Sequence, residues 1–352
     1  MSSRFVVQEV VVPPAEVPDA VSALVAGASE VLRACALEVW GHADLVRTPD
    51  AWQHHLAHAA AHRRTLWVAV ADGRVVGCAT ADFPLVDNLH LVEAVDVQVE
   101  RGWRRRGVGR ALLDAVVALS ADLGRTHLSG WSHGELAAAG DPAALRSRTD
   151  PQGLAPSAAS AFALRHGFGV AQIERHSVLS VRDAPASGGV AAGYRIETWR
   201  GATPPEWLDG LAKVWTAFST SAPLGELAWG EEYWDADRIA ASEAASEAVE
   251  DRSTGIVVHE ASGEVVAGTQ LIRDRDHDAS AQQGVTVVLG AHRGHGLGLA
   301  LKQANLALAR SAWPRLERIH TWNAGENDHM WRINAALGFR TEGGEVCWQR
   351  VL

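Results

Sequence analysis

The sequence has few cysteines and no long apolar segment. Its three cysteines, Cys35, Cys78 and Cys347, are far apart and lack the paired spacing of a zinc site or a disulfide framework. We therefore expect a reducing compartment, ordinary core thiols and no metal. No run reaches 18 apolar residues, and residues 1–9 contain no apolar signal segment. These absences predict a cytoplasmic protein without a membrane partner.

The chain also lacks an excess of positive charge. It has 32 Lys and Arg against 42 Asp and Glu, a formal net charge of −10. This balance argues against a nucleic-acid partner, which favours a basic face. It is compatible with a cationic amine substrate, although many soluble proteins are acidic. The 352 residues, 47% of them hydrophobic, fit two globular domains of about 175 residues. We expect a monomer or a homodimer.

One stretch, residues 97–116, reads as a strand, a glycine-containing turn and a helix. Val97 and Val99 alternate as strand residues do, and an apolar helical stripe begins at Ala111. Between them, Arg104-x-x-Gly107-x-Gly109 directs backbone N–H groups towards one point at a helix N-terminus. Such a point suits a diphosphate. A simple tight turn is the alternative.

The same pattern occurs a second time. Arg293-x-x-Gly296-x-Gly298 repeats the turn at an offset of 189 residues, again before an apolar helical run. Upstream, residues 71–76 resemble 261–266, and downstream 164–168 resemble 335–339, where a Gly-Phe pair recurs at an offset of 171. Three landmarks in one order indicate a tandem duplication. We predict an N-terminal domain over 1–182, a linker over 183–193 and a C-terminal domain over 194–352.

At these motifs each half resembles the GNAT superfamily of N-acyltransferases, whose acyl-CoA motif is Arg/Gln-x-x-Gly-x-Gly/Ala. The second half is similar to tandem acetyltransferases, of which mycothiol synthase is one, through residues 292–298 and 321–330. The resemblance implies an α/β (α+β) protein with two GNAT folds, each a mixed, mainly antiparallel sheet flanked by helices.

The resemblance further implies direct transfer of an acetyl group from acetyl-CoA to a small-molecule amine. The implied CoA-binding residues of the first half are Val97, Val99, Arg104, Arg105, Arg106, Gly107, Val108, Gly109 and Arg110. Those of the second half are Val288, Arg293, Gly294, His295, Gly296, Leu297, Gly298, Asn323 and Asn327. For the arginines the alternative is a solvated basic turn, and for Asn327 it is a helix cap.

The catalytic residues differ between the halves. The resemblance makes Glu93, six residues before Val99, the candidate base, whereas the second half has Gln282 at that position. Strand alternation predicts that Glu93 lies on the same face as Val99 and its neighbours, with Asp96 on the other face. We therefore slightly favour chemistry in the first half.

The general acid is harder to place. The family has a Tyr four residues before the Gly of the Gly-Phe pair, but here those positions hold Ala163 and Asn334. Asn334 and the strand residues Ser132 and His133 are the candidate substitutes. Two other functions remain open: acetylation of a protein amine, and a non-catalytic acyl-CoA-binding regulatory role.

Two further segments have ambiguous patterns. Pro49 opens a helix predicted over 50–62, whose histidines at i, i+4 spacing suit a metal but more often line a solvated face. The Trp-rich stretch 226–234 is either a wall for an aromatic or cationic substrate or a helix junction that buries its tryptophans.

Overall fold

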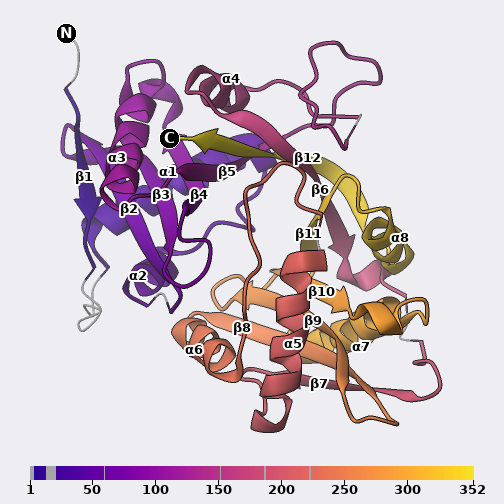
Figure 1. The fold of residues 1–352 in the computed structure, drawn as a ribbon. Coiled ribbons are helices and arrows are strands. Elements are labelled where there is room, and N and C mark those ends of the chain that lie inside the picture. Colours follow the sequence, from indigo (N-terminus) through magenta and orange to yellow (C-terminus); the bar gives the residue numbers. More distant parts are fainter. Residues whose placement is uncertain (1–3, 13–20, 59, 151, 186–187, 222) are drawn as a thin grey trace. The chain divides into compact units, whose positions relative to one another are not determined.

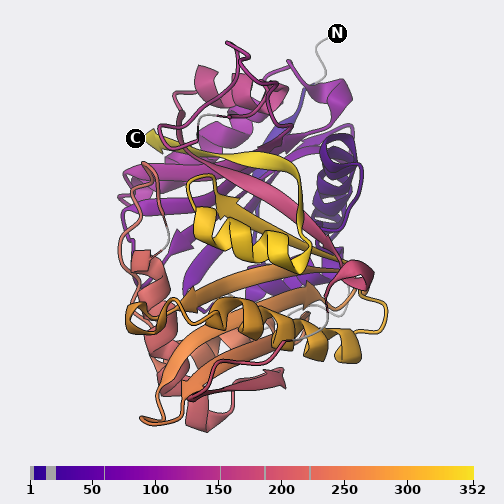
Figure 2. The same ribbon diagram turned by 90° about the vertical axis from the view of Figure 1, so that its right-hand side faces the viewer.

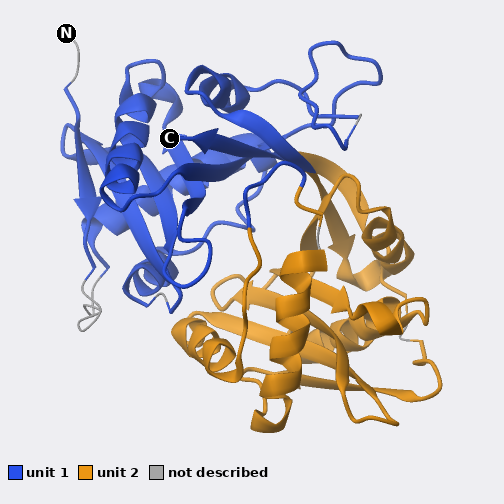
Figure 3. Ribbon diagram, in the orientation of Figure 1, with its two compact units in different colours: residues 1–173, 225–229, 345–352 blue, residues 174–224, 230–344 orange. Residues whose placement is uncertain are grey.

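The computed structural model describes residues 4–12, 21–58, 60–150, 152–185, 188–221 and 223–352. The chain forms two compact units (Figure 3). Unit 1 comprises residues 1–173, 225–229 and 345–352, and unit 2 comprises 174–224 and 230–344. Within the predicted linker, residues 186–187 lie outside the described residues. The boundaries at 182 and 194 stay a prediction.

The sheet of unit 1 begins with β1 (Val6–Val10), β2 (His62–Ala71), β3 (Arg74–Pro84), β4 (Leu91–Val99) and β5 (His127–Gly134), in that spatial order (Figure 1). The end of β12 (Arg340–Val351) and the start of β6 (Gly169–Ser180) follow. The first four strands are antiparallel, and β5 runs parallel to β4. Of this parallel pair, β4 leads into the first loop, and β5 follows α3.

Helices cover both faces of this sheet. They are α1 (Ala23–Trp40), α2 (Pro49–Ala57), α3 (Val108–Asp122) and α4 (Ala158–Arg165), and a 3₁₀ turn, η1 (Arg101–Trp103), precedes α3. Leu66 and Val68 of β2 belong to the core with α1 and α2, whereas the alternate residues Trp67 and Ala69 belong to the core with α3. The period of two along β2 therefore separates two hydrophobic layers.

Unit 2 repeats this arrangement. Its strands are β7 (Tyr194–Arg200), β8 (Glu250–His259), β9 (Val265–Asp274), β10 (Ser280–Val288) and β11 (Arg318–Ala324), and the end of β6 pairs antiparallel with β11. The order is β6-β11-β10-β9-β8-β7, with β10 parallel to β11. Its helices are α5 (Pro205–Ser221), α6 (Ala236–Ser246), α7 (Leu297–Ala312) and α8 (Asp328–Leu337), and η3 (Gly290–His292) precedes α7.

The two faces of unit 2 also carry separate cores. Ile256 and Val258 of β8 pack with α5, whereas Val257 between them packs with α7. In Figure 2, α7 and α8 both face the viewer, in front of the strands of this unit. Throughout the described ranges, no helix combines the length and apolar content that crossing a bilayer requires.

The predicted fold class is confirmed: the sheets are mixed, mostly antiparallel and flanked by helices. The helix predicted over 50–62 was too long. It ends at Ala57, and His62 opens β2, where residues 62–64 pair with the end of β3 up to Pro84. The strand gains cross-strand backbone hydrogen bonds there that a longer isolated helix would not have. As a residue of β2, His62 lies near Glu93, which the sequence predicts as the base.

Candidate functional site

The two glycine loops have the same backbone conformation. In unit 1, Arg105 and Gly107 have positive φ values of 64° and 88°, and in unit 2 Gly294 and Gly296 have values of 84° and 70°. In each loop, residues with positive φ alternate with residues of negative φ, an arrangement that can turn successive N–H groups towards one side and form an anion-binding concavity. Each concavity lies at the N-terminus of a helix, of 15 residues in α3 and 16 in α7. Both loops therefore fit a diphosphate.

The second glycine of each motif has a packing role. A Cβ on Gly109 would lie 3.2 Å from the Phe162 ring of α4, and one on Gly298 would lie 3.2 Å from Ile333 of α8. The two pairs occupy corresponding positions of the duplicated units. At Gly109 and Gly298 the absent side chain thus lets the next helix approach the loop, a requirement distinct from close approach of an anion.

The motif arginines hold the loops to their strands. Arg104 donates from Nε to the Val99 carbonyl oxygen at 2.9 Å, and its two terminal nitrogens each donate to Glu38 of α1 at 2.8 Å. Arg293 donates from Nε to the Val288 carbonyl oxygen at 3.1 Å. The guanidinium that the sequence assigned to a phosphate is therefore partly used to fix the turn.

The other predicted CoA residues divide by exposure. Val108 and Leu297 are buried, so they offer a ligand only their backbone. Arg106 lies over the Trp103 ring at 5.1 Å, and Arg110 pairs with Asp114 at 3.5 Å. Five predicted side chains are exposed around the loops: Arg105, Arg106, Arg110, Arg293 and His295. These are the side chains best placed to meet phosphate oxygens.

The parallel strands pair only at their beginnings. Within the described chain, β4 pairs with β5 at Leu91 and Val92, and β10 pairs with β11 from Ser280 to Gln282. The later part of β4, which includes Val97 and leads to the loop, lies outside this parallel ladder. Backbone groups there can pair with an extended ligand arm, as an added strand would.

A β-bulge changes the face on which Glu93 lies. Asp82 of β3 is opposite Glu93 and Thr80 is opposite Asp96, so β4 has one residue more than β3 between these pairs, and Ala94 has φ 49°. Residues opposite Asp82 and Thr80 share a face, because these are two apart on β3. The expectation that Glu93 and Asp96 lie on opposite faces is therefore wrong: both lie on one face of β4, and Val97 and Val99 lie on the other.

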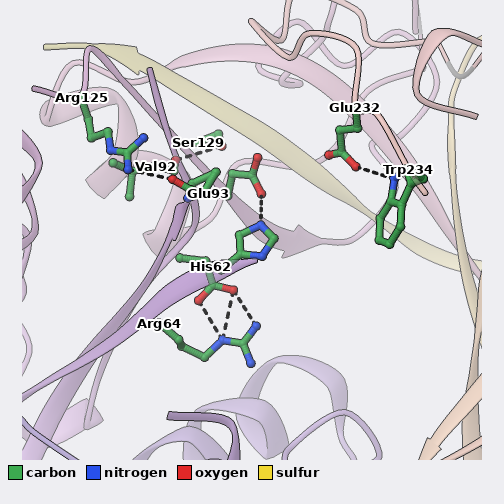
Figure 4. Close-up of polar contacts among 10 residues, drawn as sticks. His62, Arg64, Val92, Glu93, Arg125, Ser129, Glu232 and Trp234 are labelled. Atoms are coloured by element: carbon green, nitrogen blue, oxygen red, sulfur yellow. Dashed lines mark hydrogen bonds and ion pairs between the residues drawn. The ribbon is translucent and has the colours of Figure 1, made fainter. Parts of the chain in front are cut away.

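Glu93 belongs to a polar cluster that Figure 4 shows. Its side chain is 18% exposed, and Oε2 lies 3.6 Å from Nε2 of His62. Beside it, Arg64 donates to both oxygens of Asp82 at 2.8–3.1 Å. The cluster lies on the α1–α2 face, because His62 and Arg64 share a face of β2 with Leu66, which belongs to the core with these helices. On α2, burial, with smaller contributions from Arg47 and Arg64, lowers the pKa of His55 to about 2. Sequence reasoning missed His62, because the helix prediction removed it from β2.

Aromatic side chains lie on the same face. The His133 ring of β5 stacks on Trp40 at the end of α1, with centroids 3.5 Å apart. Trp131, two residues earlier and on the same strand face, has its ring centroid 5.7 Å from that of Trp229. All four are partly exposed. The face that carries Glu93 thus also offers flat apolar surfaces.

Asp96 has a different environment. It accepts a hydrogen bond from Nε2 of Gln98 at 2.7 Å and lies near Cys35 and Cys78. Although the residue keeps some exposed surface, desolvation of its carboxyl group raises the pKa to about 6, against the lowering effect of the hydrogen bonds. A carboxylate at this position opposes folding at neutral pH.

Asp96→Asn is therefore expected to stabilise the protein at pH 7.5 by roughly 1–3 kcal/mol. The upper value is the free energy that corresponds to the rise in the pKa of Asp96. Between pH 4 and 6 the folded chain holds more protons at this site than the unfolded chain, so wild-type stability falls as pH rises through that window. Chemical denaturation at several pH values measures the difference. An advantage for the variant that is equally large at pH 4 and pH 7.5 would contradict this explanation.

Unit 2 has a row of buried polar side chains that begins on α7, the helix that corresponds to α3 of unit 1. Lys302 of α7 donates from Nζ to Oδ1 of Asn334 at 2.6 Å, and Asn334 donates from Nδ2 to Oδ1 of Asn323 at 2.6 Å. Asn327 accepts from the Met330 N–H at 3.2 Å and so caps α8. The predicted residues Asn323 and Asn334 are brought together, and Lys302 is a residue that sequence reasoning missed.

A family model matches one part of the chain, and solved structures match nearly all of it. Residues 27–138 match the family model described as Acetyltransferase (GNAT) family. A tandem GNAT protein from the clavulanic acid biosynthesis pathway, solved without AcCoA, has 25% identity and a TM-score of 0.77, covering 99% of this chain and 98% of its own. A GCN5-related N-acetyltransferase from Sphaerobacter thermophilus has 15% identity and a TM-score of 0.64, covering 99% and 95%. No curated protein matches the sequence.

Proposed function

We propose that the protein transfers an acetyl group from acetyl-CoA to a small-molecule amine. Residues 27–138 match the GNAT acetyltransferase family model, and a tandem GNAT protein has a similar structure over nearly the whole chain. The proposed chemistry takes place in unit 1. The observation that carries it is the polar cluster of Glu93 and His62 on the sheet face that also presents Trp131 and His133.

The residues present fit acetyl-CoA as the donor. The left-handed positions Arg105 and Gly107 shape a backbone concavity for the diphosphate, and the exposed Arg106 and Arg110 supply positive charge beside it. The part of β4 beyond Val92 offers backbone groups to the pantetheine arm. Acetyl-CoA supplies the acetyl group as a thioester, which an amine can attack directly.

Glu93 is the group that we assign to the amine proton. It is the first residue of β4 after the segment paired with β5, so its carboxylate lies where the parallel strands stop pairing. A carboxylate there can accept a proton from the attacking amine, and His62 at 3.6 Å can share that proton. Arg64 and Asp82 are paired with each other and need not compete for it.

The surroundings of Glu93 favour a small cationic amine with an aromatic or apolar body. A carboxylate attracts the cation, and partly exposed rings such as Trp40 and Trp131 can pack against a flat or apolar substrate. A net charge of −10 adds a long-range attraction for cations.

The test is release of CoA thiol from acetyl-CoA by the full chain with three sets of acceptors: small aromatic amines, small aliphatic amines, and lysine-containing peptides. We expect turnover above background hydrolysis with small amines, fastest for cationic aromatic ones. Turnover only with peptides would favour a protein acetyltransferase. Binding of acetyl-CoA without turnover on any acceptor would favour the non-catalytic alternative.

A further inference from the structure

A row of buried polar side chains adjoins the loop of unit 2. Lys302 is 3% exposed and Asn334 is 2% exposed. The row runs from α7, the helix that the loop opens, through α8 to Asn323 near the end of β11. Ile333, the neighbour of Asn334, packs on the loop residue Gly298. The row therefore lies where β10 and β11 have stopped pairing and the loop begins.

The duplicated unit shows that the fold does not require this row. The motif offset of 189 residues places Leu113 at the position of Lys302, and the offset of 171 places Ala163 at that of Asn334. Both are buried apolar residues, 1% and 8% exposed. Burying an ammonium group is costly, so its presence in one copy alone points to a ligand rather than to packing.

Lys302 has no counter-ion in the described part of the protein. Burial lowers the pKa of its amine to about 7, and no charged group contributes to that change. The groups facing Nζ are neutral: the amides of Asn334 and, behind it, Asn323, and the Phe339 ring, 5.7 Å away. A cation in this environment is stabilised most by an anion that arrives with a ligand.

We propose that the loop of unit 2 binds free CoA, with its sulfur as the thiolate, in preference to acetyl-CoA. In this arrangement Asn334 faces the sulfur and Lys302 supplies the positive charge behind it. The inference rests on the proposed function, because acetyl transfer in unit 1 releases the CoA that this loop would bind. It agrees with Gln282 at the position of Glu93, since a site that receives the product needs no base for an amine.

The chemistry balances within the site. On binding, the S–H bond of CoA breaks, the electron pair stays on sulfur, and the proton ends on the neutral amine of Lys302. The net charge of the complex does not change. The thioester sulfur of acetyl-CoA has no proton to give and no charge to stabilise. Unit 2 thus distinguishes the product from the donor and is suited to regulation by product.

The experiment compares the two ligands on full-length protein with Gly107→Val, a change expected to weaken binding at the loop of unit 1 by about 50-fold. Calorimetry at pH 7.5 is expected to give a Kd for CoA at least about tenfold below that for acetyl-CoA, the value of one charge-assisted hydrogen bond. Adding Lys302→Leu and Asn334→Ala, which copies the pair found in unit 1, is expected to make the two constants equal. Lys302→Met alone is expected to have most of this effect.

Desulfo-CoA, which lacks the sulfur, provides a second readout and should bind like acetyl-CoA. Equal affinities for CoA and acetyl-CoA, or a preference that survives Lys302→Met, would overturn the inference and leave the proposed function intact. Absence of binding by either ligand at this loop would overturn the inference but not the chemistry proposed for unit 1.

Folding of the variants is checked by denaturation against pH. Between the pKa of about 7 in the folded chain and the ordinary lysine pKa of 10.5, the unfolded chain holds more protons on Lys302. Stability therefore rises with pH through this window when Lys302 is present. The variants without Lys302 should be more stable at pH 7 and lack the rise. If the variants without Lys302 still become more stable as the pH rises, another group causes that rise.

Discussion

Glu93→Gln is expected to lower kcat for acetyl transfer by about 100-fold or more, while the Kd for acetyl-CoA changes less than about twofold. The amide keeps the size and hydrogen-bonding capacity of the carboxylate next to His62 but cannot accept the proton of the amine. The side chain lies on the face opposite the valines of β4, so it does not support the pantetheine arm. The measurements are steady-state rates of thiol release and calorimetric titration with acetyl-CoA.

The matched control is Glu100→Gln. Glu100 follows β4 directly and pairs with Arg74, so the change also removes a carboxylate from an ion pair next to the same strand. This ion pair is partly exposed and lies several residues along the chain from Val92, where β4 stops pairing with β5. The kcat of Glu100→Gln should therefore stay within about twofold of the wild-type value. Equal loss in both variants, or an unchanged rate for Glu93→Gln, would show that Glu93 is not the base.

Gly107→Val and Gly296→Val are each expected to weaken acetyl-CoA binding at their own loop by about 50-fold. Both glycines have positive φ, which a β-branched residue adopts only at high cost. The loop must then change its backbone and lose the equivalent of one N–H contact to phosphate, which is worth about 1.5–3 kcal/mol when charge-assisted. Calorimetry should show two sites in the wild type and one in each variant.

Gly102→Val and Gly290→Val are the controls. Both glycines lie in the 3₁₀ turns just before the loops, have no positive φ and have open space where a side chain would be placed. Their substitution adds the same bulk without changing the concavity, so two sites should persist. If the controls lose binding as strongly as the loop variants, bulk near the loop, and not the backbone conformation, explains the effect.

The duplication and the two loops could be predicted from the sequence, because glycines at fixed spacing have few alternatives. A position that needs positive φ selects Gly, and Gly107 and Gly296 both have it. The close approach of Phe162 to Gly109 could not be foreseen, since it depends on where α4 packs.

The side-chain geometry of the candidate sites was less predictable. The bulge at Ala94 leaves no residue-type signal, yet it reverses the face of Glu93 relative to simple alternation. His62 was lost because helix propensity does not register the strand partner that residues 62–64 find on β3. Lys302 had a signal that was available: a charged residue within an apolar helical stripe, where the first copy has Leu113.

A crystal structure of the full chain with acetyl-CoA tests the central claim most directly. Density for the diphosphate is expected against the backbone N–H groups of residues 105–109, of 294–298, or of both. A ligand bound only elsewhere on the protein, with both loops holding no phosphate, would contradict the account.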